Sequence, residues 1–387
     1  MQIGRFVSAV LTVVLIASCE LISPLGKQSP QVQTLNLDTF EQTMLANIGQ
    51  QWDGFAYAIN QNGNLRRSDF FGLWDRSGTS ADLTTPIYGS SINKFVAAVA
   101  VMKVMQNNPG VDLDNGIAGF LPPAWGATND LSAFIQTVTI RGLLTHTSGI
   151  PGPQAGTFNS DYTTLRNIAQ NGLGVAPAAG YAYSNANYGF LRMFIASMNG
   201  ASYWGTDQQM ENTAIGEYRM FMENEVFSLA GQLSDVGTAG IAPTTNPSSA
   251  LYYLWNQTSG GWVIGDRSAN LASGGYYFSV LDLAQFLAYL NHSEQIITAA
   301  NRQILYDAFF GLSDGAPPPL SPNGARGWYY SKAGSLADGT GRGNRNVIAI
   351  LPGGIEVVFM ANSRGGVMDG TGVLRNAIFA AYDASWE

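Results

Sequence analysis

The stretch "YGSSINKFVAAVAV" (residues 88–101) places a lysine at the start of an apolar segment, three residues after a serine. Residues three apart lie on the same face of an α-helix, so Ser91 faces Lys94, whereas Ser90 is rotated away. Ser91 would also lie at the helix N-terminus, where free backbone N–H groups favour developing negative charge. Because the residues after Lys94 are apolar on nearly every face, the pattern predicts a buried helix from Ser91 to about Met105.

A serine beside a buried lysine is typical of covalent catalysis. Burial disfavours the ammonium form, so we expect the pKa of Lys94 to be lowered, and the neutral amine can then take the proton of the Ser91 hydroxyl. The alternative is structural: Ser91 caps the helix and Lys94 extends its amine to solvent. The chain has four lysines, and Lys94 is the only one that follows a serine at this spacing.

Two later stretches favour the catalytic interpretation. Tyr183-Ser184-Asn185 follows a segment rich in proline and glycine, at a predicted junction of loop and helix, where a side chain can project into a cleft. Lys332-Ala333-Gly334 lies in a predicted strand. Tyr289-Leu290-Asn291 repeats the Tyr-x-Asn spacing, but it falls within a predicted helix that an amphipathic pattern already explains.

The ordered motifs Ser-x-x-Lys, Tyr-x-Asn and Lys-x-Gly resemble those of the serine β-lactamase and penicillin-binding-protein superfamily. The Tyr-x-Asn form is similar to the branch of class C β-lactamases, D-alanyl-D-alanine carboxypeptidases, D-aminopeptidases and related esterases. The segments "LLTHTSG" (143–149), "ASGGYYFSVLDLAQFLAYL" (272–290) and "GIEVVFMANS" (354–363) also resemble that branch. The resemblance therefore extends over roughly residues 38–385.

The resemblance implies a role for each motif residue. Ser91 attacks a carbonyl and forms an acyl-enzyme, while Lys94 and Tyr183 share the proton transfers. Asn185 orients the substrate amide. Lys332 supplies positive charge that holds a substrate carboxylate or stabilises the Tyr183 phenolate.

The third motif also provides the strand that runs beside the nucleophile. The resemblance places Gly334 in the substrate-binding strand and assigns the oxyanion hole to the backbone N–H groups of Ser91 and Ser335. Relatives in this branch normally have a hydroxyl residue where this chain has Ala333. A methyl group cannot hydrogen-bond a substrate carboxylate. The sequence therefore favours esters or peptides that lack this carboxylate, unless Ser335 or Ser331 compensates.

His146 invites comparison with a Ser-His-Asp triad, but the chain has two histidines and no Gly-x-Ser-x-Gly elbow to hold a nucleophile. The resemblance instead implies a structural role for His146. Two distant histidines and a single cysteine give no metal-ligand spacing, so we expect no metal and no other cofactor. A net charge of −8 without clusters of Lys and Arg argues against nucleic acid as a partner.

Strand patterns lie at both ends of the chain, with helical patterns between them. Residues 55–73 predict a hairpin, and residues 326–363 predict an antiparallel meander of strands. We therefore predict an α+β fold, an α/β sandwich of the β-lactamase/DD-peptidase type, within a single domain at 36–387. Its antiparallel sheet is built from both chain ends and flanked by helices, and a mainly helical subdomain is inserted at about 90–270.

The N-terminus is typical of a bacterial lipoprotein. Residues 1–18 have an early arginine and an apolar stretch too short for a transmembrane helix, and "IASC" resembles the lipobox. We expect lipidation of Cys19 and a flexible tether at 19–35, which would anchor the protein to the membrane at the periplasmic face of the bacterial cell envelope. The alternative is an ordinary signal peptide with an unmodified thiol at Cys19.

The sequence therefore predicts a serine hydrolase that acts on a small-molecule ester, peptide or β-lactam substrate. An esterase or a D-peptidase of carboxypeptidase type fits the motifs best. The alternative within the same chemistry is a class C-like β-lactamase. The alternative of another class is a non-catalytic protein that binds penicillin or peptidoglycan peptides. No motif indicates an oligomeric state.

Overall fold

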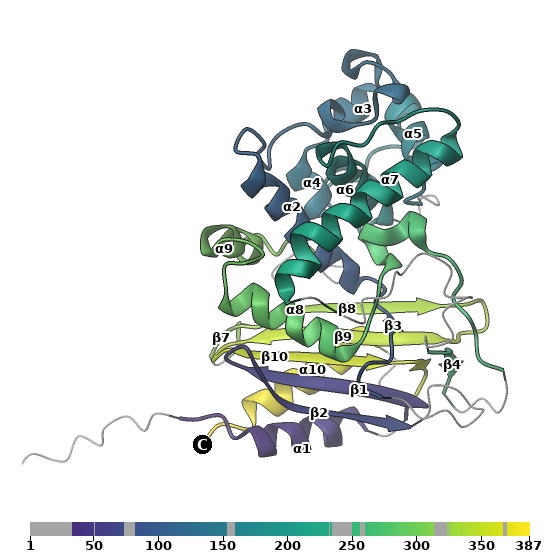
Figure 1. Cartoon of the computed structure of the whole chain (residues 1–387). Coiled ribbons are helices and arrows are strands. Elements are labelled where there is room, and N and C mark those ends of the chain that lie inside the picture. The colour runs from purple at the N-terminus through teal and green to yellow at the C-terminus, as the bar shows by residue number, and fades with distance from the viewer. Residues whose placement is uncertain are drawn as a thin grey trace, which may run out of the picture.

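The computed structural model shows one sheet with helices on both faces and a group of helices beyond one of them (Figure 1). The predicted signal, Cys19 and most of the predicted tether lie outside the described residues. The structure describes residues 33–49, 51–72, 82–152, 159–231, 233, 250–255, 260–312, 323–324, 326–366 and 370–387.

Long strands from both chain ends form the sheet in the spatial order β8–β9–β10–β1–β2, and all neighbours in this order are antiparallel. β1 pairs with β10 in a register that runs from Phe55 opposite Ala361 to Gln61 opposite Ile355. The predicted α+β sheet from the two chain ends is therefore confirmed. The bounds are β1 Gly54–Gln61, β2 Asn64–Gly72, β8 Tyr330–Ala337, β9 Gly343–Leu351 and β10 Ile355–Ala361.

Short strands complete the sheet and its surroundings. β4 pairs with one end of β9, β11 pairs with β4, and two further pairs lie outside the main sheet. The bounds are β3 Ile87–Tyr88, β4 Tyr253–Leu254, β5 Tyr277–Phe278, β6 Asn323–Gly324, β7 Gly327–Trp328 and β11 Ser363–Arg364.

The predicted hairpin of β1 and β2 turns at two residues. Asn62 and Gly63 have φ angles of 52° and 74°, in the left-handed region that these two residue types tolerate best. Two-residue hairpin turns need this conformation because it matches the right-handed twist of the strands. The Asn-Gly signal in the sequence therefore fixes the register of the first two strands.

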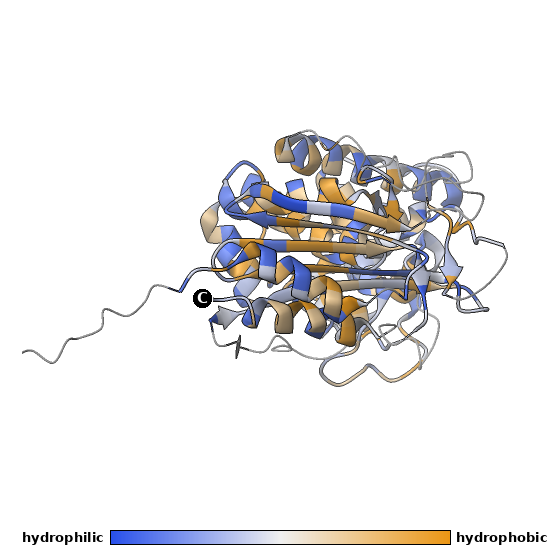
Figure 2. Cartoon of the chain, turned by 90° about the horizontal axis from the view of Figure 1, so that it is seen from below, coloured by the Kyte–Doolittle hydropathy of each residue, from blue (hydrophilic) through white to orange (hydrophobic). Residues whose placement is uncertain are grey.

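Different helices cover the two faces of the sheet. α1 (Leu37–Ile48) and α10 (Thr371–Asp383) pack together on one face, and α2 (Ile92–Asn107) and α8 (Val280–His292) pack on the other. Because both faces are covered, β9 and β10 are buried along nearly their whole length, and the central strands are largely orange in Figure 2. β2 is mostly exposed at the edge of the sheet.

The helical part lies between β3 and β5, and α2 runs through its centre. All residues of α2 from Ile92 to Val104 are buried, which confirms the predicted apolar helix. The remaining helices are α3 Ala133–Gln136, α4 Ile140–Leu144, α5 Tyr162–Asn171, α6 Asn185–Met198, α7 Asp207–Met222 and, after β5 and α8, α9 Ala299–Asp307. Short 3-10 and π-helical turns, among them η7 Ser268–Asn270 and η8 Leu271–Gly275, connect these elements.

The described residues contain neither a candidate membrane-spanning helix nor a candidate metal-binding cluster. None of their helices is both long enough and apolar enough to cross a bilayer. The same residues hold no group of three or more His, Cys, Asp or Glu side chains placed to bind a metal ion.

Candidate active site

Ser91 lies directly before the first residue of α2. The amine of Lys94 and the hydroxyl of Tyr183 both contact its side chain there. The hydroxyl of Ser91 makes no capping hydrogen bond to the helix. Instead, Lys94 Nζ donates to Ser91 Oγ at 3.2 Å, and the Tyr183 hydroxyl donates to the same atom at 2.7 Å. The alternative in which Ser91 caps the helix and Lys94 reaches solvent is therefore wrong, since Lys94 has no exposed surface at all.

The amine of Lys94 is held from two sides. Besides Ser91, it donates to the backbone carbonyl of Ser273 in η8 at 2.6 Å. The segment that contains Ser273 was expected to belong to the family, but its role as a partner of the lysine was not expected. This carbonyl helps to fix the position of the amine, which can donate to it in either the charged or the neutral form.

A strained turn sets the orientation of Ser91. Ser90 has a φ angle of 50°, in a region that few residues other than glycine adopt. Its hydroxyl donates to Asn344 Oδ1 at 3.0 Å, and Asn344 Nδ2 donates to the Tyr88 carbonyl oxygen at 2.6 Å. Strain of this kind persists only where surrounding contacts impose it, and it gathers at functional sites. Ser90 thus positions its neighbour rather than reacting itself.

Tyr183 lies in the loop before α6, beside two buried lysines. Lys94 Nζ is 4.9 Å and Lys332 Nζ is 5.3 Å from the centre of its ring. Burial alone would raise the pKa of the phenol, but the positive charges of Lys94 and Lys332 and the hydrogen bonds with Lys94 and Ser91 outweigh it, so the pKa lies below the usual value of 10. The phenolate form is therefore easier to reach here than in water.

His146 supports the Tyr183 loop and does not reach the nucleophile. Its Nδ1 accepts a hydrogen bond from the Ser184 backbone N–H at 3.3 Å, and its own carbonyl accepts one from the Ala182 N–H at 2.8 Å. Its ring centre is 4.5 Å from that of Tyr183. Burial, together with the charges of Lys94 and Lys332, holds the pKa of His146 well below 6.5, so the imidazole is neutral. This arrangement agrees with the structural role that was expected.

The third motif lies on β8, next to the start of α2. Lys332 is fully buried on the α2 side of the sheet. A Cβ atom on Gly334 would lie 2.6 Å from the Gly89 carbonyl oxygen and 3.2 Å from Ser90 Cβ, so only glycine allows this approach. The strand can therefore run directly beside the residue before the nucleophile.

Ala333 faces the opposite side of the sheet from Lys332. Its methyl group belongs to the core beneath α1 and α10, and it does not line the pocket around Ser91. Arg345, which lies opposite Ser335 on β9, hydrogen-bonds the Ser335 hydroxyl. The side chain of residue 333 therefore does not contribute to this pocket, and its lack of a hydroxyl is weaker evidence against carboxylate binding than the sequence suggested.

A pocket of about 170 Å³ opens beside Ser91. It brings together three of the predicted site residues from different elements: Ser91 before α2, Asn185 at the first turn of α6, and Ser335 on β8. Asn270 and Arg267 also line it, and the sequence had not indicated either of them. The arrangement offers a serine hydroxyl with two proton-transfer partners at the edge of a polar pocket.

Comparisons with known proteins agree with the fold and with membership of one family. A sequence model of the Beta-lactamase family matches residues 37–382. The putative penicillin-binding protein PbpX of Bacillus subtilis (strain 168) is 25% identical over 267 residues, which cover 67% of this chain. The match spans 60% of the length of PbpX.

Solved structures resemble this chain over most of its length. EstCE1, a hydrolase with promiscuous acyltransferase activity, superposes with a TM-score of 0.65 at 16% identity and covers 89% of this chain and 99% of its own. A class C β-lactamase superposes with a TM-score of 0.63 at 18% identity and covers 89% and 95%, respectively. The chain belongs to the Beta-lactamase family, within the superfamily of serine β-lactamases and penicillin-binding-protein-like proteins.

Proposed function

We propose that this protein is a serine hydrolase that forms an acyl-enzyme on Ser91 and hydrolyses an ester or amide, as an esterase or D-peptidase does. The observation that carries the proposal is the pair of hydrogen bonds to Ser91 Oγ, at 3.2 Å from Lys94 Nζ and at 2.7 Å from the Tyr183 hydroxyl. A nucleophile in hydrogen-bond contact with its base is the arrangement that covalent catalysis needs.

The proposed reaction begins with proton transfer from Ser91. Neutral Lys94 or the Tyr183 phenolate takes the hydroxyl proton as Oγ bonds to the substrate carbonyl carbon, and the carbonyl oxygen becomes the oxyanion. When the carbonyl re-forms, the bond to the leaving group breaks, and Tyr183 returns the proton to that group. Water, deprotonated by the same residues, then releases the acyl group from Ser91.

The remaining motif residues serve binding in this proposal. Asn185 lines the pocket and orients the acyl amide, and the backbone N–H groups of Ser91 and Ser335 stabilise the oxyanion. Lys332 keeps the region around Tyr183 positive, which favours both the phenolate and an anionic transition state.

Covalent labelling tests the proposal. A fluorophosphonate and, separately, a fluorescent penicillin are applied to the protein, to the Ser91→Ala variant and to Ser228→Ala, which removes an exposed hydroxyl outside the pocket. We expect the fluorophosphonate to label Ser91 in the wild type and in Ser228→Ala only. Labelling by the penicillin with turnover of nitrocefin would favour the class C-like β-lactamase. Labelling by neither reagent would favour the non-catalytic binding protein and contradict the proposal.

We also propose that Cys19 carries a lipid anchor that holds the protein at the periplasmic face of the bacterial cell envelope. The proposal rests on the apolar N-terminal stretch and on the sequence "IASC" that ends at Cys19. Expressed in a bacterium, the full chain should fractionate with membranes, and mass spectrometry should find an acylated cysteine. Cys19→Ala should lose both properties. An unmodified wild-type cysteine would contradict the anchor.

A further inference from the structure

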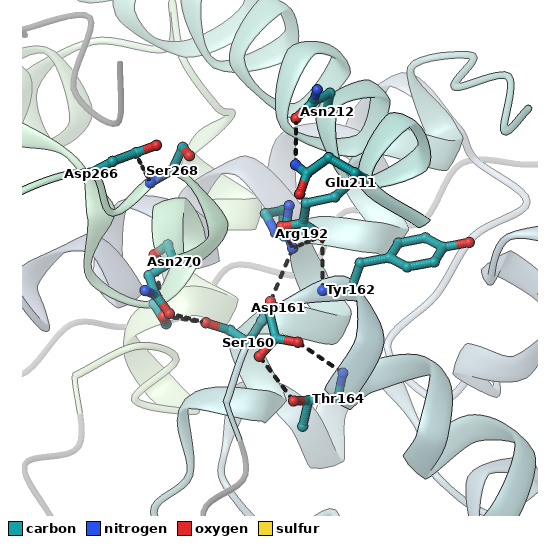
Figure 3. Close-up of polar contacts among 12 residues, drawn as sticks. Ser160, Asp161, Tyr162, Thr164, Arg192, Glu211, Asn212, Asp266, Ser268 and Asn270 are labelled. Atoms are coloured by element: carbon teal, nitrogen blue, oxygen red, sulfur yellow. Dashed lines mark hydrogen bonds and ion pairs between the residues drawn. The ribbon is translucent and has the colours of Figure 1, made fainter. Parts of the chain in front are cut away.

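Arg267 lies where two cavities meet. It lines the pocket of Ser91, and it also lines a larger cavity of about 540 Å³ between α5, α7 and η7. Asn270 is shared by both cavities in the same way. Figure 3 shows part of the larger cavity, with Asp266, Ser268 and Asn270 facing the residues of α5 and α7. Arg267 and Asn270 therefore lie at the boundary between the two cavities.

Among the described residues, the guanidinium of Arg267 has no hydrogen-bond or ion-pair partner. No hydrogen bond or ion pair joins it to any side chain or carbonyl of the described residues, and its Nε is buried without an acceptor. Other arginines of these regions are each paired with a carboxylate: Arg141 with Asp114, Arg166 with Asp207, Arg192 with Glu211 and Arg342 with Asp338. The Nε atoms of Arg166 and Arg192 also lack an acceptor, so what distinguishes Arg267 is that none of its guanidinium donors has a partner among the described residues. Buried donors without an acceptor are costly, and those of Arg267 are open to a ligand in the pocket.

The neighbours of Arg267 leave its charge uncompensated. Asp266, next to it in the chain, uses Oδ1 to accept the Ser268 backbone N–H at 2.8 Å. Tyr88 and Tyr277 are electrostatically close, but burial raises the pKa of both phenols, so they remain neutral. The residues that line the pocket of Ser91 include no Asp or Glu. This pocket is therefore positive, with Arg267 as its only charged lining residue among those described.

The larger cavity has the opposite charge. Asp161, Asp207, Glu211 and Asp266 line it, although Arg166 and Arg192 pair with two of these carboxylates. A negative group of a ligand is therefore favoured near Ser91 and disfavoured farther along. The change of sign occurs at Arg267 and Asn270, which favours a ligand whose negative charge lies on the Ser91 side of this boundary.

We propose that Arg267 is a specificity-determining residue that binds a carboxylate on the acyl part of the substrate. The inference rests on the proposed hydrolase function and names its substrate class: esters or amides whose acyl chain ends in a carboxylate. The planar guanidinium fork matches the two carboxylate oxygens and supplies the donors that lack a partner in the protein.

Paired substrates test the proposal. The para-nitrophenyl monoester of glutaric acid and para-nitrophenyl pentanoate have acyl chains of equal length, with and without a carboxylate. We expect the wild type to have the higher kcat/KM for the glutarate ester. Arg267→Gln should lower the ratio of the two kcat/KM values by about 10- to 100-fold, because a charged hydrogen bond is lost. Arg267→Lys should retain part of the preference.

Arg67→Gln is the matched control, since Arg67 lies on the edge strand β2 and pairs with Asp38 on α1. This variant should keep the wild-type ratio. A wild type that prefers the pentanoate ester, or an Arg267→Gln variant with an unchanged ratio, would overturn the proposal.

Binding without turnover separates this proposal from the hydrolase proposal. Calorimetry with the methyl monoester of glutaric acid, on Ser91→Ala and on Ser91→Ala combined with Arg267→Gln, needs no acylation. Binding by the first variant and a loss of about 10-fold or more in the second supports the carboxylate site even if neither nitrophenyl ester is consumed. Equal binding by both variants overturns the site even if Ser91 hydrolyses esters.

Discussion

The amine of Lys94 lies 2.6 Å from the carbonyl oxygen of Ser273, a residue 179 positions later in the chain. This contact explains how a lysine with no exposed surface is accommodated, because its amine donates one hydrogen bond to this carbonyl and another to Ser91 Oγ. It also keeps the amine within reach of the nucleophile.

Lys94→Met should abolish acylation of Ser91 while the fold survives. The methionine fills the space of the lysine stem, but the proton acceptor is lost, and the Ser273 carbonyl is left without its donor. We expect the acylation rate to fall by at least about 10²–10⁴-fold and the free energy of unfolding to fall by about 1–3 kcal/mol. Stopped-flow acylation and urea unfolding measure the two effects.

Lys103→Met is the control for that variant, since Lys103 is also a buried lysine of α2 and lies 3.8 Å from Glu225. It should lose stability but acylate at the wild-type rate. Unchanged acylation in Lys94→Met would refute the assigned role of Lys94 in proton transfer.

Tyr183→Phe should remove a pH-dependent step and preserve the packing of the ring against His146. The phenol has a pKa below 10, so in the wild type kcat/KM for a neutral ester should rise with pH as the phenolate forms, over a range below that of an ordinary tyrosine. The variant should lack this rise and lose about 10²–10⁴-fold in rate. Identical pH profiles of variant and wild type would show that Tyr183 does not exchange the proton.

His146→Asn should change how stability depends on pH. The pKa of His146 lies well below 6.5 in the folded protein, so below pH 6.5 the unfolded chain binds a proton that the folded protein does not. Acidification therefore favours unfolding, by up to about 1.4 kcal/mol per pH unit, until pH reaches the folded pKa. The stability is fully present above pH 6.5.

Asparagine suits this position because it tolerates the φ angle of 58°. Urea unfolding between pH 5 and pH 8 should show a smaller loss of stability on acidification in His146→Asn than in the wild type, a comparison that cancels the contributions of other groups. Parallel pH curves would mean that the imidazole is protonated in the folded protein.

The sequence located the reacting groups because their spacing is local. Three residues of helix bring Lys94 onto the face of Ser91, and the Asn-Gly turn fixes the register of β1 and β2. Ser273 and Arg267 could not be found in this way, since they approach the site only through the packing of η8 against α2 and of η7 against η8, α6 and α7. Asn344 and Asn346, two apart at the start of β9, were a signal of polar contacts on the α2 side of this strand.

Gly334→Ala should separate β8 from the start of α2. The new methyl group would lie 2.6 Å from the Gly89 carbonyl oxygen, and neither backbone can move without shifting Ser91 or the strand beside it. We expect a loss of about 1–3 kcal/mol in the free energy of unfolding and a loss of about 10²-fold or more in the acylation rate, because the oxyanion hole no longer aligns.

The matched control is Gly339→Ala, two residues beyond the end of β8, where an added Cβ meets nothing within 4 Å. It should leave both quantities unchanged. A Gly334→Ala variant with wild-type acylation would show that the approach of β8 to Ser90 is not needed for the reaction.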